Sequence, residues 1–305
     1  MDTVTGSFGY IGKYITRRLI YVGRQVQTIT TNPDKPNPFG GIVRAFPYHF
    51  ENPKKLIQTL TGVETLYNTY WIRFPYDGQS YEDALENTRT LFHCAKEAGV
   101  GRIVQISVTH ASTSSDLPYY HGKGRQEEML AETGIDYAII RPTLVFGDED
   151  ILVNNIAWFM RKFPIFPVFG DGNYRLQPVF VEDLARIAVD IADAPSGTIM
   201  DAIGRETFTY KDFLQLIVDT LKRKILLVPV PPSAGILMGK IIGLFLGDVV
   251  LTKNEMRGLM EENLVSDQVP NGETLFSEWL KSHRDTVGKV YSSEINRHFR
   301  WKPEK

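Results

Sequence analysis

The sequence predicts an α/β protein built on a doubly wound parallel sheet, with a smaller, interleaved substrate-side region toward its C-terminus. β-branched runs alternate with helical stretches through the first half, a glycine-rich turn follows the first run, and the alternation loosens after Pro142. Such alternation is typical of βαβ units, whose parallel strands are joined by helices. We therefore expect a core domain over residues 1–147 and a second region over 148–305.

The elements of the first half are expected in a regular order. Strands are predicted at 3–5, 25–31, 42–46, 64–70, 102–107 and 137–141. Helices are predicted at 10–21, 53–60, 79–98 and 118–133. Gly99 and Gly134 follow two of these helices, where glycine readily adopts the left-handed conformation that ends a helix.

The second half mixes helices and short strands. Helices are predicted at 151–161, 182–193 and 211–222, strands at 176–181, 198–203 and 226–230, and further amphipathic helices after 252. This mixture indicates a substrate-side region whose late strands return to the sheet.

Composition narrows the class of function. The 305 residues are 43% hydrophobic, which is enough for a large core, and 34 basic residues face 36 acidic ones. A nearly neutral chain has no global field that would attract nucleic acid, so we expect a small-molecule role. The single cysteine, Cys94, cannot form an internal disulfide, which favours a reducing compartment.

The N-terminus and the histidines add two expectations. Residues 1–4 lead directly into the glycine turn and leave no room for the apolar segment of a signal peptide, so we expect a cytoplasmic protein. The six histidines show no spacing typical of metal ligands, so no metal site is expected.

Three glycines at the end of the first strand predict a phosphate site. Gly6 permits a tight turn, Gly9 lets backbone N–H groups approach a pyrophosphate at the helix N-terminus, and Gly12 allows close packing of helix on strand. An ordinary turn is the alternative, but the position at a strand-to-helix junction favours a dinucleotide site. The residues predicted to bind are Gly6, Ser7, Phe8, Gly9, Tyr10, Ile11 and Gly12.

A tyrosine and a lysine share one face of the helix predicted at 118–133. Tyr119 and Lys123 are four residues apart, which brings their side chains together. Lowering a tyrosine pKa from about 10 to about 7 requires roughly 4 kcal/mol of preferential phenolate stabilisation, which a neighbouring ammonium helps to supply. Tyr119 is therefore a candidate general acid or base, with Tyr120, three residues before the lysine, as the reserve. Ordinary helix packing with a solvated lysine is the alternative.

Several motifs carry a resemblance to a known family. They are the turn T-G-x-x-G-x-I-G from Thr5, Asn87-Thr88-Arg89, Gly99 to Val104, Tyr119-x-x-x-Lys123, Arg141-Pro142 through Phe146-Gly147, Gly170-Asp171-Gly172, and Pro178 to Asp183. In this order, over residues 1–230, they resemble the atypical and extended branches of the short-chain dehydrogenase/reductase superfamily, a family with a Rossmann fold. The chain looks most like the group that contains the nucleotide-binding accessory subunit of respiratory complex I and small bacterial quinone-reductase-like proteins.

The resemblance implies an NAD(P) cofactor. Where NAD-preferring relatives carry an acid after the second strand, this chain has Thr30, Thr31 and Asn32, which favours NADP over NAD, and Lys35 is a candidate for the 2′-phosphate, as is Arg44. The resemblance also places Asn68 and Thr69 beside the pyrophosphate, and Pro142 and Val145 beside the nicotinamide.

The resemblance assigns further roles around the tyrosine. Lys123 would also bind the nicotinamide ribose, and a hydroxyl after the preceding strand would polarise the substrate carbonyl. Ser107 and Thr109 are the candidates, Thr109 being better placed. Asn87 is a further candidate near the active site, and Arg175 and Gln177 are candidates to face substrate.

Two functions are consistent with these features. The first is an NAD(P)-dependent oxidoreductase or epimerase-like enzyme that transfers a hydride between nicotinamide and a carbonyl or alcohol carbon of a small, partly apolar substrate. The second is a redox-silent accessory or sensor protein that binds the nucleotide within an assembly.

The helix expected at 233–246 is apolar around most of its circumference. We expect it to pack beneath the C-terminal helices, since such a helix is normally buried. The alternative is docking to a membrane surface or a partner protein.

Overall fold

The computed structural model describes residues 1–299 and divides them into two compact units. The first unit is Met1–Pro142 with Leu184–Asp201, and the second is Thr143–Asp183 with the described residues from Ala202 onward. The units therefore alternate along the chain, whereas the sequence predicts one boundary after residue 147.

The first unit is built on a seven-stranded sheet. Its strands are β1 (Asp2–Thr5), β2 (Val26–Thr30), β3 (Arg44–Pro47), β4 (Thr65–Asn68), β5 (Arg102–Ile106), β6 (Asp136–Pro142) and β11 (Thr198–Ala202). Their order in space is β11-β6-β5-β4-β1-β2-β3. All pairs from β3 to β6 are parallel, and the order reverses between β1 and β4. This is the doubly wound α/β architecture that the sequence predicts.

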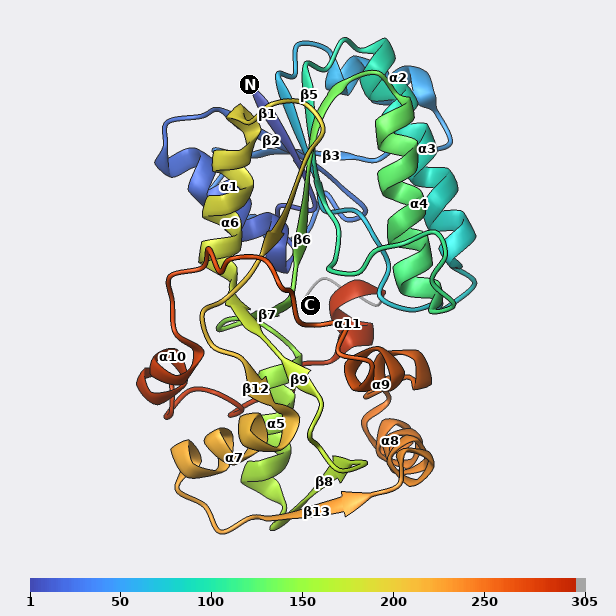
Figure 1. Cartoon of the computed structure of the whole chain (residues 1–305). Coiled ribbons are helices and arrows are strands. Elements are labelled where there is room, and N and C mark those ends of the chain that lie inside the picture. The colour runs from blue at the N-terminus through green and yellow to red at the C-terminus, as the bar shows by residue number, and fades with distance from the viewer. Residues whose placement is uncertain (300–305) are drawn as a thin grey trace. The chain divides into compact units, whose positions relative to one another are not determined.

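Helices cover both faces of the sheet. They are α1 (Tyr10–Tyr21), α2 (Pro53–Leu60), α3 (Tyr81–Glu97), α4 (Pro118–Glu132) and α6 (Val181–Asp190), which continues into a short 3-10 turn at Ile191–Asp193. Figure 1 shows α1 and α6 on one face and α2, α3 and α4 on the other. Buried aliphatic and aromatic side chains fill the layer beneath α2, α3 and α4, including Leu56, Leu60, Leu66, Leu91, Phe92 and Ile103. Each is withdrawn from water, and this burial is the main favourable term in folding.

The second unit is a mixture of helices and two-stranded ribbons. Its parallel pairs are β7 (Leu144–Phe146) with β10 (Pro178–Phe180) and β8 (Ile165–Phe169) with β13 (Leu226–Val230); β9 (Arg175–Leu176) and β12 (Phe208–Thr209) are antiparallel. The helices are α5 (Leu152–Lys162), α7 (Tyr210–Leu221), α8 (Pro232–Leu246), α9 (Lys253–Met260), α10 (Phe276–Ser282) and α11 (Glu294–His298). Aromatic rings stack in the core of this unit. The ring centroids of Phe213 and Phe276 are 4.8 Å apart.

The expected burial of the apolar helix is wrong. α8 seats its glycines, Gly235, Gly239 and Gly243, against the protein and directs large side chains outward. Leu244 is 84% exposed and Phe245 is 87% exposed. Since the three glycines recur every four residues, they form one stripe along the helix. This stripe lets α8 lie close to the rest of the second unit. Within residues 1–299, no helix combines the length and apolar character needed to cross a bilayer.

Candidate functional site

The turn between β1 and α1 depends on close backbone contact. Gly6 has a φ of +68°, and the N–H of Gly9 donates to the carbonyl oxygen of Gly6 at 2.8 Å. A Cβ on Gly12 would lie 2.4 Å from that same oxygen. Any side chain at position 12 would therefore force α1 away from the turn, which explains the third glycine of the motif.

The N-terminus of α1 follows at the carboxyl end of β1. Gly9 occupies the cap position and no side chain caps the helix. Backbone N–H groups at a helix start, together with the helix dipole, stabilise an anion such as a pyrophosphate. Of the predicted residues, Phe8, Tyr10 and Ile11 are half-buried around this point.

Ser7 is a structural member of the turn. Its side chain is buried, its N–H donates to Oγ1 of Thr28 at 3.0 Å, and its Oγ accepts from Oγ1 of Thr16 at 2.7 Å. These bonds tie the turn to β2 and α1.

Two residues at the end of β4 are fixed to the same turn. Thr69 donates through Oγ1 to the carbonyl oxygen of Thr5 at 2.6 Å, while its N–H donates to Oγ1 of Thr5 at 2.6 Å. Oδ1 of Asn68 accepts from Oγ1 of Thr5 at 3.2 Å, and Nδ2 donates to Oε1 of Gln105 on β5 at 2.8 Å. Asn68 and Thr69 therefore lie beside the glycine turn, where the sequence predicts them.

Lys123 is buried on α4 in a partly aromatic environment. It is 3% exposed, its Nζ donates to the carbonyl oxygen of Ile106 at 2.9 Å, and the same atom lies 5.2 Å from the ring centroid of Trp71. Burial lowers the pKa of Lys123 to about 7, although the nearby Glu127 carboxylate opposes this shift. A change of pH near neutrality therefore changes the charge at this position.

The two glycines that flank Lys123 have packing roles. A Cβ on Gly122 would lie 2.5 Å from the Trp71 ring, and one on Gly124 would lie 2.4 Å from the carbonyl carbon of Ser112. Both positions require glycine because Trp71 and the backbone at 112–113 occupy the space that a side chain would need.

Trp71 is a site residue that the sequence reading missed. Its ring meets the ring of Tyr119 edge-on at 6.4 Å and stacks with that of Tyr81 at 5.7 Å. Its indole Nε1 is buried without a hydrogen-bond partner. The available signal was its position after Asn68-Thr69-Tyr70, at the carboxyl end of a central strand, where ligands of α/β proteins bind.

The two candidate hydroxyls have different partners. Ser107 donates through Oγ to Glu127, whose carboxylate also binds the Arg141 guanidinium, with a distance of 2.9 Å from Nε. This ion pair raises the pKa of Arg141. Oγ1 of Thr109 lies 3.4 Å from the carbonyl oxygen of Pro142. Ser107 is therefore engaged by the Glu127–Arg141 ion pair, and Thr109, two residues further along, is the better-placed candidate to meet substrate.

The residues that the sequence places near the nicotinamide have partners within the protein. Pro142 ends β6 and accepts the Thr109 N–H at 3.1 Å, while Val145 pairs with Val179 in the second unit. Asn87 donates through Nδ2 to the Tyr70 hydroxyl at 2.8 Å. Burial raises the pKa of Tyr70, and this hydrogen bond partly offsets the effect.

The two residues expected to face substrate from the second unit have internal partners. Arg175 forms an ion pair with Glu262 at 2.6 Å. Nε2 of Gln177 donates to the carbonyl oxygen of Gly204 at 2.9 Å.

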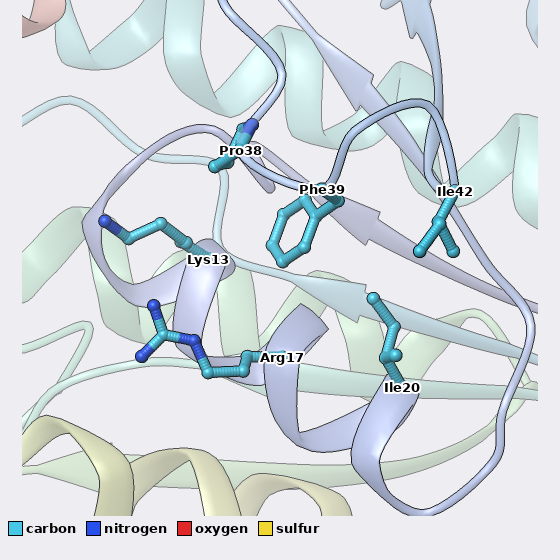
Figure 2. Close-up of a pocket in the computed structure, with 6 residues that line it drawn as sticks. All are labelled: Lys13, Arg17, Ile20, Pro38, Phe39 and Ile42. Atoms are coloured by element: carbon cyan, nitrogen blue, oxygen red, sulfur yellow. The ribbon is translucent and has the colours of Figure 1, made fainter.

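A pocket of about 180 Å³ lies between α1 and the loop that follows β2. Figure 2 shows Lys13 and Arg17 on one side and Phe39 opposite them, and the full lining is Lys13, Arg17, Ile20, Pro38, Phe39 and Ile42. Sequence reasoning missed these cations, although Lys13 and Arg17 are four residues apart and so share a helix face.

The residues expected to read the 2′-phosphate lie in and near the same loop. Thr31 is exposed, and Asn32 and Lys35 are half-buried just beyond the end of β2. Arg44 pairs with Gln27 at the amino end of β3, and the glycine turn lies at the opposite, carboxyl end of the sheet. The loop after β2 and the helix α1 are therefore better placed than Arg44 to contact a 2′-phosphate. Among residues 1–299, no group of three or more His, Cys, Asp or Glu side chains is arranged to hold a metal ion.

We expect the buried Lys123 to produce a measurable pH dependence of stability. The unfolded chain binds this proton more tightly, with an ordinary pKa of 10.5 against about 7 in the folded protein. Protein stability should therefore rise as the pH increases from 7 toward 10. Lys123→Met should abolish this contribution, and it leaves the Ile106 carbonyl its bond from Nε2 of Gln105.

Urea denaturation across this pH range checks the expectation. Arg125→Met is the matched control, because Arg125 is an exposed cation on the same helix. Equal pH slopes for wild type and Lys123→Met would show that Lys123 keeps an ordinary pKa.

Comparisons with known proteins agree with this geometry. The family described as NAD(P)H-binding matches residues 6–155. Two relatives are the mitochondrial NADH dehydrogenase [ubiquinone] 1 alpha subcomplex subunit 9 of Arabidopsis thaliana and of Dictyostelium discoideum. Each is 26% identical over an alignment of 231 residues, and the two alignments cover 72% and 71% of this chain. The matches span only 58% and 63% of those relatives' own lengths.

Solved structures share the fold at low identity. The Citrobacter sp. triphenylmethane reductase complexed with NADP(H) has a TM-score of 0.76 and 17% identity, covering 92% of this chain and 99% of the other. An NADPH-dependent quinone oxidoreductase from Escherichia coli, complexed with NADPH, has a TM-score of 0.73 and 21% identity, with coverages of 88% and 92%. A nucleoside-diphosphate-sugar epimerase from Staphylococcus aureus has a TM-score of 0.72 and 18% identity, with coverages of 99% and 100%.

The glycine turn, the strand order, the family match and these relatives lead to one assignment. The chain carries an NAD(P)H-binding domain over residues 6–155 on a Rossmann sheet, and its relatives agree with the predicted resemblance to the atypical branch of the short-chain dehydrogenase/reductase superfamily.

Proposed function

We propose that this chain is an NADP-dependent oxidoreductase or epimerase-like enzyme. It would transfer a hydride between the nicotinamide and a carbonyl or alcohol carbon of a small, partly apolar substrate. The observation that carries the proposal is the position of Tyr119 and the buried Lys123 on α4, in the unit that holds the nucleotide-binding turn. Bound nucleotide would supply the hydride.

The residues fit the dinucleotide at two points. The first turn of α1 offers backbone N–H groups to the pyrophosphate, and Gly9 keeps a side chain out of their path. Asn68 and Thr69 border the same turn from β4. Lys123, Pro142 and Val145 are assigned to the nicotinamide half through the family resemblance.

Tyr119 would manage the proton of the reaction. In reduction, its hydroxyl gives a proton to the substrate oxygen while the hydride reaches the carbon, so a carbonyl becomes an alcohol. The Lys123 ammonium stabilises the phenolate that remains, and this effect weakens above the lysine pKa of about 7. Thr109 would hold the substrate oxygen by a hydrogen bond, and Ser107 would hold Glu127 and so support α4.

The preference for NADP rests on the charge beside the adenosine half. Lys13 and Arg17 form a cationic wall opposite Phe39 in the loop after β2, and no acid takes the usual place at Thr30. A 2′-phosphate there would gain charge-assisted hydrogen bonds from the two cations. The cytoplasmic location stays a prediction.

A specific observation favours a second candidate function. Nζ of Lys123 already donates to Ile106 and lies against Trp71, which also contacts Tyr119. A tyrosine and lysine held in this way suit a redox-silent protein that binds the nucleotide within an assembly. The relatives named as NADH dehydrogenase subunits are consistent with that role.

Replacement of Tyr119 separates the two candidates. If Tyr119 is the acid, Tyr119→Phe should leave NADPH affinity unchanged and lower turnover on a panel of aldehydes, ketones and quinones by about two orders of magnitude. NADPH oxidation is followed by absorbance, with Tyr120→Phe as the control because Tyr120 is the neighbouring tyrosine. No turnover by wild type on any carbonyl would favour the redox-silent function, and equal turnover by Tyr119→Phe would reject Tyr119 as the acid.

Replacement of the two α1 cations tests the cofactor preference. The double variant Lys13→Gln, Arg17→Gln should bind NADPH about tenfold more weakly while its NADH affinity is unchanged, because only NADPH carries the 2′-phosphate. Arg18→Gln is the control, since Arg18 lies on the same helix and faces Asp190. Titration of nucleotide fluorescence measures both constants, and tighter binding of NADH than NADPH by wild type would refute the preference.

A further inference from the structure

An exposed apolar surface runs along α8. We define the α8 face as Leu237, Met238, Ile241, Leu244 and Phe245, which are 60%, 39%, 46%, 84% and 87% exposed. Helical spacing places all five on one side, opposite the glycine stripe. Large apolar patches of this kind mark interaction surfaces.

The packing of α8 shows that this orientation is built into the sequence. A Cβ on Gly235 would lie 2.5 Å from the Phe169 ring, and one on Gly243 would lie 2.5 Å from the carbonyl oxygen of Asp248. Rotating the helix to bury its large side chains would bring them into these spaces, where not even a methyl group fits. The α8 face therefore stays in water unless another surface covers it.

The charged residues of the segment that contains α8 are mostly cations. Residues 222–254 contain five cations and one acid. The cations are all exposed: Lys222, Arg223, Lys224, Lys240 and Lys253. The acid, Asp248, is buried and accepts hydrogen bonds from the Tyr291 hydroxyl and from the N–H groups of Glu294 and Ile295. The solvent-facing charge of this segment is therefore positive throughout.

The ribbon that leads into α8 repeats the combination of apolar and cationic side chains. Figure 1 shows β13 running directly into the helix. Leu226, at the start of β13, is 63% exposed and pairs with Ile165, which is 57% exposed. Lys222, Arg223 and Lys224 directly precede this strand.

From these observations we infer that α8 and the start of β13 dock on a bilayer surface that carries anionic phospholipid. Leu, Ile, Met and Phe side chains without hydrogen-bonding groups suit the acyl boundary, and each nearby Lys or Arg is attracted to an anionic surface. The helix would lie in the interface without crossing it.

Vesicle co-sedimentation of the full chain tests this docking. Wild type should bind vesicles made of equal parts phosphatidylcholine and phosphatidylglycerol, and bind phosphatidylcholine alone weakly. Phe245→Asp and Leu244→Asp should each lower the binding at least about tenfold, since each replaces a membrane-facing apolar group by a charge. Val269→Asp is the matched control, because Val269 is 85% exposed in a loop after α9.

The variants should keep the wild-type melting temperature, because Leu244 and Phe245 are exposed. If a variant does not fold, the triple variant Lys222→Gln, Arg223→Gln, Lys224→Gln decides, with loss of binding to anionic vesicles as the supporting result. Absence of wild-type binding to anionic vesicles, or equal binding by Phe245→Asp, would overturn the proposal. A concentration-dependent doubling of mass without lipid, abolished by Phe245→Asp, would assign the face to a second copy of the chain instead.

Discussion

The nucleotide-binding unit depends on one steric constraint, the approach of Gly12 to the carbonyl oxygen of Gly6. A Cβ there would lie 2.4 Å from that oxygen, so only glycine lets α1 start this close to β1. The first helical N–H groups are thereby directed over the carboxyl end of the sheet, beside the point where the strand order reverses between β1 and β4. Every proposed contact with the pyrophosphate follows from this placement.

A chain of buried side-chain hydrogen bonds links this turn to the helix that carries the proposed catalytic pair. It passes from Thr5 to Asn68, Gln105, Gln126 and Thr88. Gln126 is less than one turn from Lys123 on α4. Since buried polar groups are costly when unpaired, a fully paired network of this kind fixes the relative positions of β1, β4, β5, α3 and α4. The turn and the tyrosine–lysine pair are therefore held in one rigid frame.

Local sequence signals predicted most of the first unit. The bounds of α1 and α2 agree with the prediction to the residue, as do those of β13 in the second unit, because periodicity and chain-breaking signals are local. β7 and β12 were missed because strands of two or three residues carry no readable period. The sequence analysis also missed β8, which pairs with β13 in a two-stranded ribbon; Pro167 and Pro229 both fit there because a strand of such a ribbon has an open edge.

Contacts between distant residues limited the prediction of the site. The glycine turn was readable because its geometry is local, whereas Trp71 meets Gly122 and Lys123 only after the sheet has formed. Likewise, the apolar content of α8 suggested burial, because hydropathy alone does not show which side of a helix faces the protein. The four-residue glycine spacing held the missing information, because it identifies the side on which the helix is seated.

The central claim is that the N-terminus of α1 binds the pyrophosphate of NADPH, and fluorescence titration of wild type against Gly9→Val tests it most directly. The φ of −90° at Gly9 is open to any residue, and a Cβ there would lie 3.2 Å from the Gly6 carbonyl oxygen, so the substitution adds bulk in front of the helix and requires a small shift of the turn. The account predicts saturable binding of NADPH by wild type and its loss in a variant whose circular dichroism spectrum shows that it is folded. Equal affinities for the two proteins, or no binding by wild type, would contradict it.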